Sequence, residues 1–323
     1  MRKIGVQSMG AVDKRDIEGS YKRIKEAGID FIDFGLDEFV PGYVIKNGDS
    51  VELLAQDFDK VYKEFEPHIK AIKKAGLFAG QFHAPFPMRI RRKPEWNERL
   101  NRMTINSIKL CRAFDCDRIV IHPVSFGFYD NPQEEWDFNI KMYTELIPFA
   151  KEEKVMILLE NMFLGVNGHI VEASCSDFAE AARYIDTLND IAGEELFGFC
   201  FDVGHANLLA KNLYKAVTTL GKRIKALHVH DNDGIMDLHT LPFVFARGQD
   251  GQSTDWKGFL LGLHDGGYEC DINFETYRLM KTFPLELHTE VLRLTAALGR
   301  YMSNIIENGY PEYETPMNSG WVR

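Results

Sequence analysis

Short apolar runs recur along the chain, and most of them end in a polar residue that is followed by a loop and a stretch with helical periodicity. Two such runs are residues 199–205 (FCFDVGH) and residues 226–234 (ALHVHDNDG). A run of this kind is typical of a strand that is buried on both faces in a parallel sheet. The polar residue at its end then emerges at the edge of the sheet, where chemistry can take place.

The periodicity predicts eight strands separated by helices. We predict strands at residues 4–8, 29–35, 77–83, 118–122, 155–160, 196–202, 224–230 and 270–275. We predict helices at residues 13–27, 51–75 (with Pro67 as a point where it could break), 94–114, 133–153, 176–188 (capped by Ser176), 207–220, 256–264 and 284–307. Residues 39–48, 161–173 and 231–252 are expected to be loops, and the length of the last one suggests a function.

Strands that alternate with helices along the whole chain indicate an α/β fold. Eight such repeats, without a linker or a shift in composition, are the pattern of a (β/α)8 TIM barrel. We therefore expect a single domain over residues 1–323, in which residues 284–323 form a C-terminal helix and a tail that could mediate contacts in a homo-oligomer. Active sites of such barrels lie at the C-terminal ends of the strands, so the polar residues at those ends are the candidates for function.

The composition narrows the classes of partner. Lys and Arg number 38 and Asp and Glu number 48, so the formal net charge is −10, which argues against binding to nucleic acid through a basic surface. The start of the chain lacks the apolar core of a signal peptide, and no apolar run is long enough to span a bilayer, so we expect no membrane partner. Five cysteines, an odd number without a CxxC motif, favour reduced thiols and a cytoplasmic location.

Residue types that bind metal ions stand at or just after the ends of the third to the eighth predicted strand. Because these ends meet at one mouth of a barrel, their side chains are expected to converge. Imidazole and carboxylate groups suit Zn, Mn and Co, and carboxylates also suit Mg, so we expect one of these divalent ions as the cofactor. The residues are His83, His122, Glu160, Asp202, His205, His228, His230, Asp237, His239 and Glu275.

Each member of this set also has a structural explanation of its own. A single His before a proline, such as His122, often serves as a hydrogen-bonded core residue. Glu160 and Glu275 are harder to explain in this way, because a carboxylate buried without a partner is costly. The occurrence of such residues on six consecutive strands favours a metal site. His228 and His230 lie two apart on one strand and point to the same side, so either could be the ligand.

Three motifs resemble those of the xylose-isomerase-like barrel superfamily: LLEN at residues 158–161, FDVGH at residues 201–205, and HVHDNDG at residues 228–234 with DLH at residues 237–239. This superfamily contains sugar and sugar phosphate isomerases and epimerases, inosose dehydratases and metal-dependent AP endonucleases. The first His of its H-x-x-D pattern binds metal, which implies His228 as the ligand and His230 as a residue behind it. The implied set of metal ligands is Glu160, Asp202, His228 and Glu275.

The resemblance implies a divalent-metal-dependent isomerase or epimerase that acts on a sugar, a sugar phosphate or a related polyol. Glu160 and Glu275 would be the catalytic residues, serving as base and acid in proton transfer through an enediolate. His83 and His205 would bind the hydroxyl groups of the substrate. The implied partner is therefore a small molecule rather than a nucleic acid.

Other residues could shape specificity for that substrate. Arg247, in the loop after the seventh strand, is the better candidate for binding an anionic group, and the basic run at residues 89–93 is a weaker one. Aromatic side chains could cover the apolar face of a sugar. The aromatic candidates are Phe86, Phe163 and Trp256.

The AP endonuclease branch is the alternative, because it cleaves phosphodiesters at a multi-zinc site. The segments after two of the ligands depart from the nuclease pattern, since NMFLGV follows Glu160 in place of a glycine-rich run and VGHANLL follows Asp202 as in the isomerases. A barrel that binds sugar without catalysis is a third hypothesis. The five further nuclease ligand positions are all matched, and are candidates for additional metal or for substrate: His83, His122, His205, Asp237 and His239.

Overall fold

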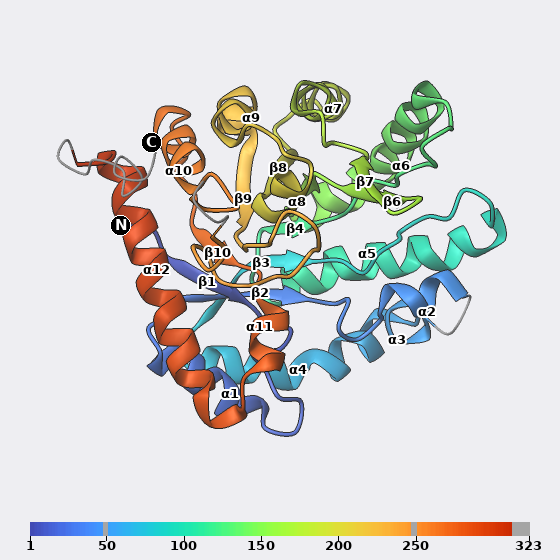
Figure 1. The fold of residues 1–323 in the computed structure, drawn as a ribbon. Helices are drawn as coiled ribbons and strands as arrows, with labels where there is room; N and C mark the ends of the chain where they lie inside the picture. Colours follow the sequence, from blue (N-terminus) through green and yellow to red (C-terminus); the bar gives the residue numbers. More distant parts are fainter. Residues whose placement is uncertain (48–50, 247–250, 312–323) are drawn as a thin grey trace.

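Eight parallel strands form the centre of the molecule, which a computed structural model describes over residues 1–47, 51–246 and 251–311. The strand order is β10-β1-β2-β3-β4-β5-β8-β9. The two end strands are joined by backbone hydrogen bonds from Val229 to Asn273 (2.9 Å) and from Glu275 to Val229 (3.1 Å). The sheet therefore curls into a barrel with the helices outside it (Figure 1), which confirms the predicted TIM-barrel fold.

Every predicted strand is present, with each end within two residues of its predicted position. A parallel barrel buries its strands on both faces, which is why continuous apolar runs predicted them well. The strands are β1 (Ile4–Gln7), β2 (Phe31–Gly35), β3 (Phe78–His83), β4 (Arg118–Val120), β5 (Met156–Glu160), β8 (Phe197–Asp202), β9 (Ile224–His228) and β10 (Ile272–Phe274).

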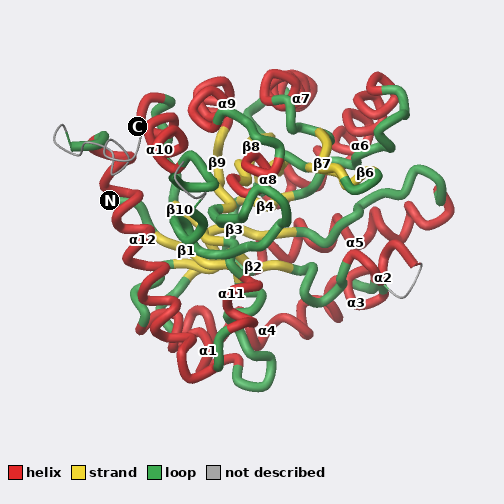
Figure 2. Tube along the Cα trace, viewed as in Figure 1, coloured by secondary structure: helices red, strands yellow, loops and turns green. Residues whose placement is uncertain are grey.

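The helices surround the strands on the outside of the barrel (Figure 2). None of the helices in the described ranges is long and apolar enough to cross a membrane. The helices are α1 (Ile17–Glu26), α2 (Gly42–Asn47), α3 (Glu52–Ala55), α4 (Phe58–Lys74), α5 (Asn97–Ala113), α6 (Pro132–Glu153), α7 (Phe178–Ala192), α8 (Val203–Leu208), α9 (Leu213–Leu220), α10 (Trp256–Asp265), α11 (Tyr277–Thr282) and α12 (His288–Asn308), with 3-10 turns at Pro94–Trp96, Gly221–Arg223 and Leu285–Leu287.

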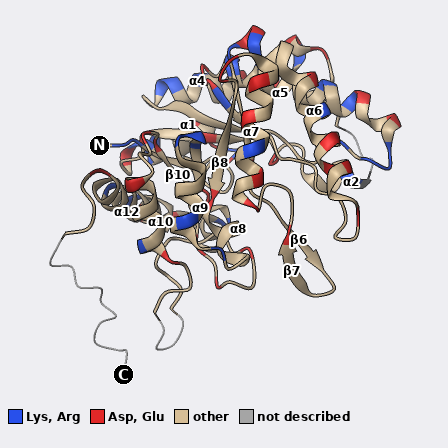
Figure 3. Cartoon of the chain, turned by 90° about the horizontal axis from the view of Figure 1, so that it is seen from above, with Lys and Arg blue, Asp and Glu red and all other residues tan. Residues whose placement is uncertain are grey.

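The predicted loop at residues 161–173 is instead an antiparallel hairpin of β6 (Phe163–Val166) and β7 (His169–Glu172). Its turn residues, Asn167 and Gly168, have φ of 51° and 81°. Positive φ at both positions is the signature of the Asn-Gly hairpin turn, so the sequence carried a signal that the loop prediction missed. The hairpin projects from the barrel (Figure 3).

Some helix boundaries also differ from the prediction. The helix predicted at residues 51–75 breaks between α3 and α4 and passes through Pro67, which is exposed, so that the carbonyl it leaves without a hydrogen bond can be solvated. Asp177 rather than Ser176 caps α7, and it accepts hydrogen bonds from Ala179 and Glu180. Helices α2, α8 and α11 were not predicted, and the tail beyond residue 311, a candidate for oligomer contacts, lies outside the described residues.

Candidate metal centre

Residues two positions apart on a strand face the same side of the sheet. An apolar layer inside the barrel consists of Val120, Leu158, Cys200 and Ala226. Two positions further along the same four strands stand the polar residues of the site. Each apolar run therefore ends by placing a ligand-type side chain just above this layer, as the C-terminal mouth of a TIM barrel requires. These residues are His122, Glu160, Asp202 and His228.

The Nδ1 atom of His228 faces a convergence of carboxylates. It lies 3.3 Å from Glu160 Oε2, 3.3 Å from Glu275 Oε2 and 3.8 Å from Asp202 Oδ2. The His228 side chain is completely buried, and neither ring nitrogen has a hydrogen-bond partner among the described residues. Such an orphaned nitrogen beside buried carboxylates has the donor chemistry of a site for a divalent cation, so these residues fit the ion that the sequence predicted.

Residues from the first two strands and β10 support this convergence. The Nε2 atom of His228 lies 3.5 Å from Asp33 Oδ2, and this carboxylate also accepts a hydrogen bond from the Asn273 amide (2.9 Å). Gln7 donates to Glu275 Oε1 at 2.9 Å. A carboxylate behind the far nitrogen of a metal-binding imidazole orients the ring and raises its basicity. Asp33 therefore orients the ring of His228, and Gln7 orients the carboxylate of Glu275.

The site carries an excess of buried negative charge. Burial opposes ionisation of Glu160, yet the charges of His228 and His122 hold its pKa well below the usual range. Burial likewise opposes ionisation of Asp202, while His205 and His230 lower its pKa. Carboxylates that stay ionised in the barrel interior need compensating positive charge. The imidazoles can supply part of it when they are protonated, and a divalent cation can replace that proton charge.

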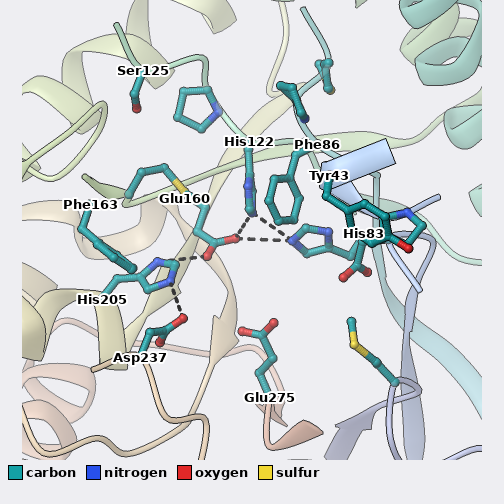
Figure 4. A pocket seen from close by; sticks show the side chains of 18 of the residues that line it. Tyr43, His83, Phe86, His122, Ser125, Glu160, Phe163, His205, Asp237 and Glu275 are labelled. Carbon is teal, nitrogen blue, oxygen red and sulfur yellow. Dashed lines mark hydrogen bonds and ion pairs between the residues drawn. The ribbon is translucent and has the colours of Figure 1, made fainter. Parts of the chain in front are cut away.

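A second cluster, formed by residues at the ends of β3, β4 and β5, lies beside the carboxylates around His228. His122 Nε2 is 3.0 Å from His83 Nε2 and 3.0 Å from Glu160 Oε2. Burial would lower the pKa of His83, but Glu160 and the charge of Asp37 raise it to about 9. Figure 4 shows the two imidazoles and the carboxylate pointing toward one another at the floor of a pocket.

A third cluster is formed by residues from α8 and the loop after β9. His239 Nε2 lies 2.8 Å from Asp237 Oδ2, and His205 Nε2 lies 3.9 Å from the same oxygen. Burial opposes ionisation of Asp237, but the hydrogen bond from His239 and nearby imidazole charge lower its pKa. The buried Asp237 Oδ1 atom has no hydrogen-bond partner among the residues that the structure describes, so this cluster also has unused ligand capacity.

Three of these histidines share one orientation. The Nδ1–H groups of His83, His205 and His239 donate to the backbone carbonyls of Ala84 (2.9 Å), Asn161 (2.8 Å) and Glu275 (3.1 Å). In each ring Nε2 then faces another residue of the site, His122 in the case of His83 and Asp237 in the case of His205 and His239. This nitrogen offers a lone pair to a metal ion once it carries no proton. Backbone acceptors of this kind commonly orient metal-binding histidines.

His230 contacts the central cluster from one side. Its Nε2 atom lies 3.1 Å and 3.2 Å from the two oxygens of Asp202, and its ring stacks on that of His239 at 4.1 Å. Burial would lower the pKa of His230, but the charge of Asp202 and the hydrogen bond to it raise this pKa to about 9. His230 Nε2 also lies 3.9 Å from Asp237 Oδ1, so this ring lies within 4.0 Å of two carboxylates, whereas the His228 ring lies within 4.0 Å of four.

The clusters form the floor of a cavity of about 740 Å³. All ten ligand-type residues named from the sequence lie in these contacts, and Phe86 and Phe163 line the cavity as expected. Trp256 does not line it: the side chain is buried, and its indole nitrogen donates to Asp231. Arg247 lies outside the described residues.

The basic run at residues 89–93 does not reach the cavity. Arg89 is buried and donates to Asn101, and Arg91 pairs with Asp130 at 3.4 Å and with Glu134 at 2.5 Å. None of its residues is among those that line the cavity, and carboxylate and amide partners already contact Arg89 and Arg91, which favours a structural role for this run over binding of a substrate phosphate.

Several residues of the site were not predicted from the sequence. Asp37, after β2, lines the cavity beside His83, and one of its buried oxygens has no hydrogen-bond partner in the described part of the chain. Gln7 and Asp33 reach the site from β1 and β2. The available signal was a polar residue inside an otherwise apolar strand, which a buried barrel tolerates only when that residue has partners.

The fold and the site together define a (β/α)8 barrel protein with a candidate divalent-metal centre at its C-terminal mouth. A family model described as xylose isomerase-like TIM barrel matches residues 21–293. The chain belongs to this family.

Two curated relatives match part of the chain. It is 30% identical over 167 residues to an uncharacterised protein of Methanocaldococcus jannaschii, which covers 49% of this chain and 53% of that protein. It is 25% identical over 176 residues to an uncharacterised protein of Sinorhizobium fredii, which covers 53% of this chain and 50% of that one. The chain thus spans about half the length of the curated relatives it matches.

Solved structures resemble nearly the whole chain. A D-tagatose 3-epimerase-like protein has a TM-score of 0.64 at 19% identity and covers 93% of this chain and 99% of its own. The 3-keto-D-glucoside 4-epimerase of E. coli has a TM-score of 0.63 at 16% identity, with coverage of 93% and 100%. The IolI protein with a bound zinc atom has a TM-score of 0.63 at 16% identity, with coverage of 96% and 99%. At these identities the likeness establishes the fold.

Proposed function

We propose that the protein is a divalent-metal-dependent isomerase or epimerase of a sugar, a sugar phosphate or a related polyol. The observation that carries this proposal is the convergence of three carboxylates on the unpartnered Nδ1 atom of His228 at the floor of a deep pocket. The solved structures similar to this chain include sugar epimerases, and one of them contains zinc. Both facts favour metal-assisted chemistry on a sugar.

The residues that would hold the ion are Glu160, Asp202, His228 and Glu275. When bound, a divalent ion polarises a substrate carbonyl and makes the adjacent C–H bond more acidic. Glu160, which its imidazole neighbours keep ionised, can accept the proton. Glu275, oriented by the hydrogen bond from Gln7, can return a proton from a different strand of the barrel.

Two imidazoles can position the substrate above these carboxylates. His83 and His205 line the pocket and are both held by backbone carbonyls at Nδ1. Their Nε2 atoms face the site and can form hydrogen bonds with substrate hydroxyl groups. His83, Glu160 and His205 are buried, and burial strengthens the electrostatic interactions that stabilise an enediolate.

Exchange of a carbon-bound hydrogen with solvent tests the proposal. Protein loaded with Mn, Co, Zn or Mg is incubated in D2O with ketoses, keto-glycosides and their phosphates, and deuterium incorporation next to the carbonyl is followed by NMR. We expect metal-dependent incorporation accompanied by formation of an epimer or an isomer. Absence of exchange with every substrate, in protein shown to hold metal, would contradict the function.

A second candidate function, phosphodiester cleavage at abasic DNA, is favoured by one observation. The three side-chain clusters around Glu160, His228 and Asp237 could hold three zinc ions. Two features oppose DNA as the substrate: the acidic net charge, and acidic and basic side chains that are interspersed on the outer helices in Figure 3. Metal analysis with a nicking assay on abasic DNA separates the functions, since about three zinc ions per chain with cleavage would support the nuclease.

A further inference from the structure

The cavity above the metal centre is larger than a free sugar needs. Its volume of about 740 Å³ lies within the range of about 300–1,000 Å³ that is typical of pockets for drug-sized ligands. A hexose placed on the carboxylate floor would leave most of this space unfilled. The size of the cavity therefore suggests a substrate with a second part.

The lining above the floor includes several apolar side chains beside the exposed Lys46 and Lys281. The floor carries the imidazoles and carboxylates of the metal centre, whereas the outer wall is built by loops after β2, β3, β4 and β5. One part of this wall is the start of the β6–β7 hairpin, which contributes Met162, Phe163 and Leu164. Another part is α2, which contributes Tyr43, with Pro41 directly before the helix. An apolar outer wall favours an apolar group on the substrate.

Two phenyl rings stand at the boundary between the floor and the outer wall. Phe86 lies 4.5 Å from the ring of His122 at an interplanar angle of 33°, and Phe163 lies 5.0 Å from the ring of His205 at 69°. Figure 4 shows them on different sides of Glu160, with Tyr43 further out beside Phe86. Tyr43 is 68% exposed, so it has apolar surface available to a ligand that enters the cavity.

The charge of the cavity argues against a phosphate as this second part. Among the described residues that line it, the cations other than histidine are Lys46 and Lys281, and both are exposed. A phosphate would therefore meet more negative than positive side chains, and would lose solvation without a compensating partner. The carboxylates in the same lining are Asp37, Glu38, Glu160, Asp237 and Glu275.

We propose that the substrate is a keto-sugar glycoside that carries a planar apolar aglycone. The aglycone lies against Tyr43, Phe86 and Phe163, while the sugar occupies the polar floor. A glycosidic bond at the anomeric carbon blocks the carbonyl there, so the carbonyl beside the exchanging C–H bond is a ring ketone. This inference rests on the proposed function and specifies its substrate class.

The test compares substrates that differ in the aglycone alone. The probes are p-nitrophenyl and methyl glucosides oxidised to the ketone at C2, C3 or C4, with D-fructose as a free ketose, and kcat/KM is measured for each with the metal-loaded protein. We expect the nitrophenyl glycoside to exceed its methyl counterpart about tenfold, as one aromatic contact in a pocket can provide. Free fructose should be the poorest substrate.

Substitutions locate the aglycone site. Tyr43→Ala should reduce the preference for nitrophenyl over methyl several-fold, while kcat/KM for the methyl glycoside stays within about twofold of the parent value. Phe163→Ala should reduce the same preference, and it should also lower kcat/KM for the methyl glycoside because the Phe163 ring packs on His205. Tyr43 is exposed, so its replacement leaves the fold intact. Tyr214→Ala is the matched control, because Tyr214 is an exposed aromatic residue on α9 that does not line the cavity.

The outcomes separate this inference from the function on which it rests. Equal kcat/KM for the two glycosides, or a preference for fructose, would overturn the inference and leave the isomerase or epimerase function standing. A preference that survives both substitutions would also overturn it, because the aglycone would then bind elsewhere. Absence of turnover of every probe by protein that contains metal would overturn both.

Discussion

His230 lies with its Nε2 atom 3.1 Å and 3.2 Å from the two carboxylate oxygens of Asp202. The same carboxylate accepts the backbone N–H of His205 at 2.7 Å and so caps α8. Asp202 is therefore held by groups on two different elements before any ion binds. A carboxylate that is fixed in this way loses little conformational freedom when it binds a metal ion. Residues that hold a metal ligand in place therefore raise the affinity of the site for the ion.

Replacement of His230 by Leu should weaken metal binding about 10- to 100-fold, because Asp202 loses a donor that orients it. The affinity is measured by competition with a chromogenic chelator. His288→Leu is the control, since His288 is half-buried at the start of α12 and is not among the residues that line the cavity, and it should leave the affinity unchanged. An unchanged affinity in the His230 variant would contradict the orienting role. Complete loss of binding, equal to that of His228→Leu, would instead make His230 a ligand.

Gly204 should not tolerate a side chain, although it lies in a helix. A Cβ atom at this position would lie 1.9 Å from the Cε1 atom of His230. Gly204→Ala should therefore displace His230 from Asp202 and reduce the free energy of unfolding by about 1–3 kcal/mol, as overpacking in a core does. Denaturant titration measures the change. Gly165→Ala is the control, because its Cβ meets nothing within 4 Å, and equal stability of the two variants would contradict the clash.

The sequence was sufficient to predict the barrel and the residues at its mouth. Parallel strands buried on both faces produce continuous apolar runs, so Glu160 or Asp202 at the end of such a run is conspicuous. The residues that orient them were harder to predict. Gln7 and Asp33 come from strands far away in the chain, and their contacts with Glu275 and His228 depend on the closure of the barrel.

Each local feature that was predicted wrongly can be explained by particular residues. The hairpin at β6 and β7 was missed because its glycines suggested a loop, although Asn167 and Gly168 specify a tight turn. Pro67 does not interrupt α4 because it lies on the exposed face. Trp256 was assigned to the cavity from its residue type, and only the packing shows that its indole binds Asp231 in the core.

His68 should make the stability of the protein depend on pH. It is 5% exposed, and its Nδ1 atom shares a hydrogen bond with the Tyr21 hydroxyl at 2.9 Å. Burial, with a smaller contribution from Lys14, lowers the pKa of His68 from 6.5 to about 4. Between these values the unfolded chain binds more protons at this position, so the free energy of unfolding falls as the pH decreases from 6.5 to 4.

The slope from this group is at most about 1.4 kcal/mol per pH unit. Denaturant titrations of metal-free protein between pH 4.5 and pH 7 measure it. His68→Gln, whose amide oxygen can accept from Tyr21, should show a shallower decline than the parent protein. His169→Gln should show the parent decline, because His169 is exposed on β7. Equal slopes in the His68 variant and the parent would contradict the lowered pKa.

Glu160 and Glu275 should both be required for proton transfer, which distinguishes an enzyme from a barrel that binds sugar without reacting it. Gln keeps an oxygen that can face the metal but cannot accept a proton at neutral pH. Glu160→Gln and Glu275→Gln should therefore each lower the rate of deuterium exchange about 10²- to 10⁴-fold in protein shown by elemental analysis to retain metal. Glu64→Gln, on the exposed face of α4, is the matched control. Exchange that persists in both variants would contradict the assigned base and acid, whereas loss of exchange together with loss of metal would show that these carboxylates act as ligands alone.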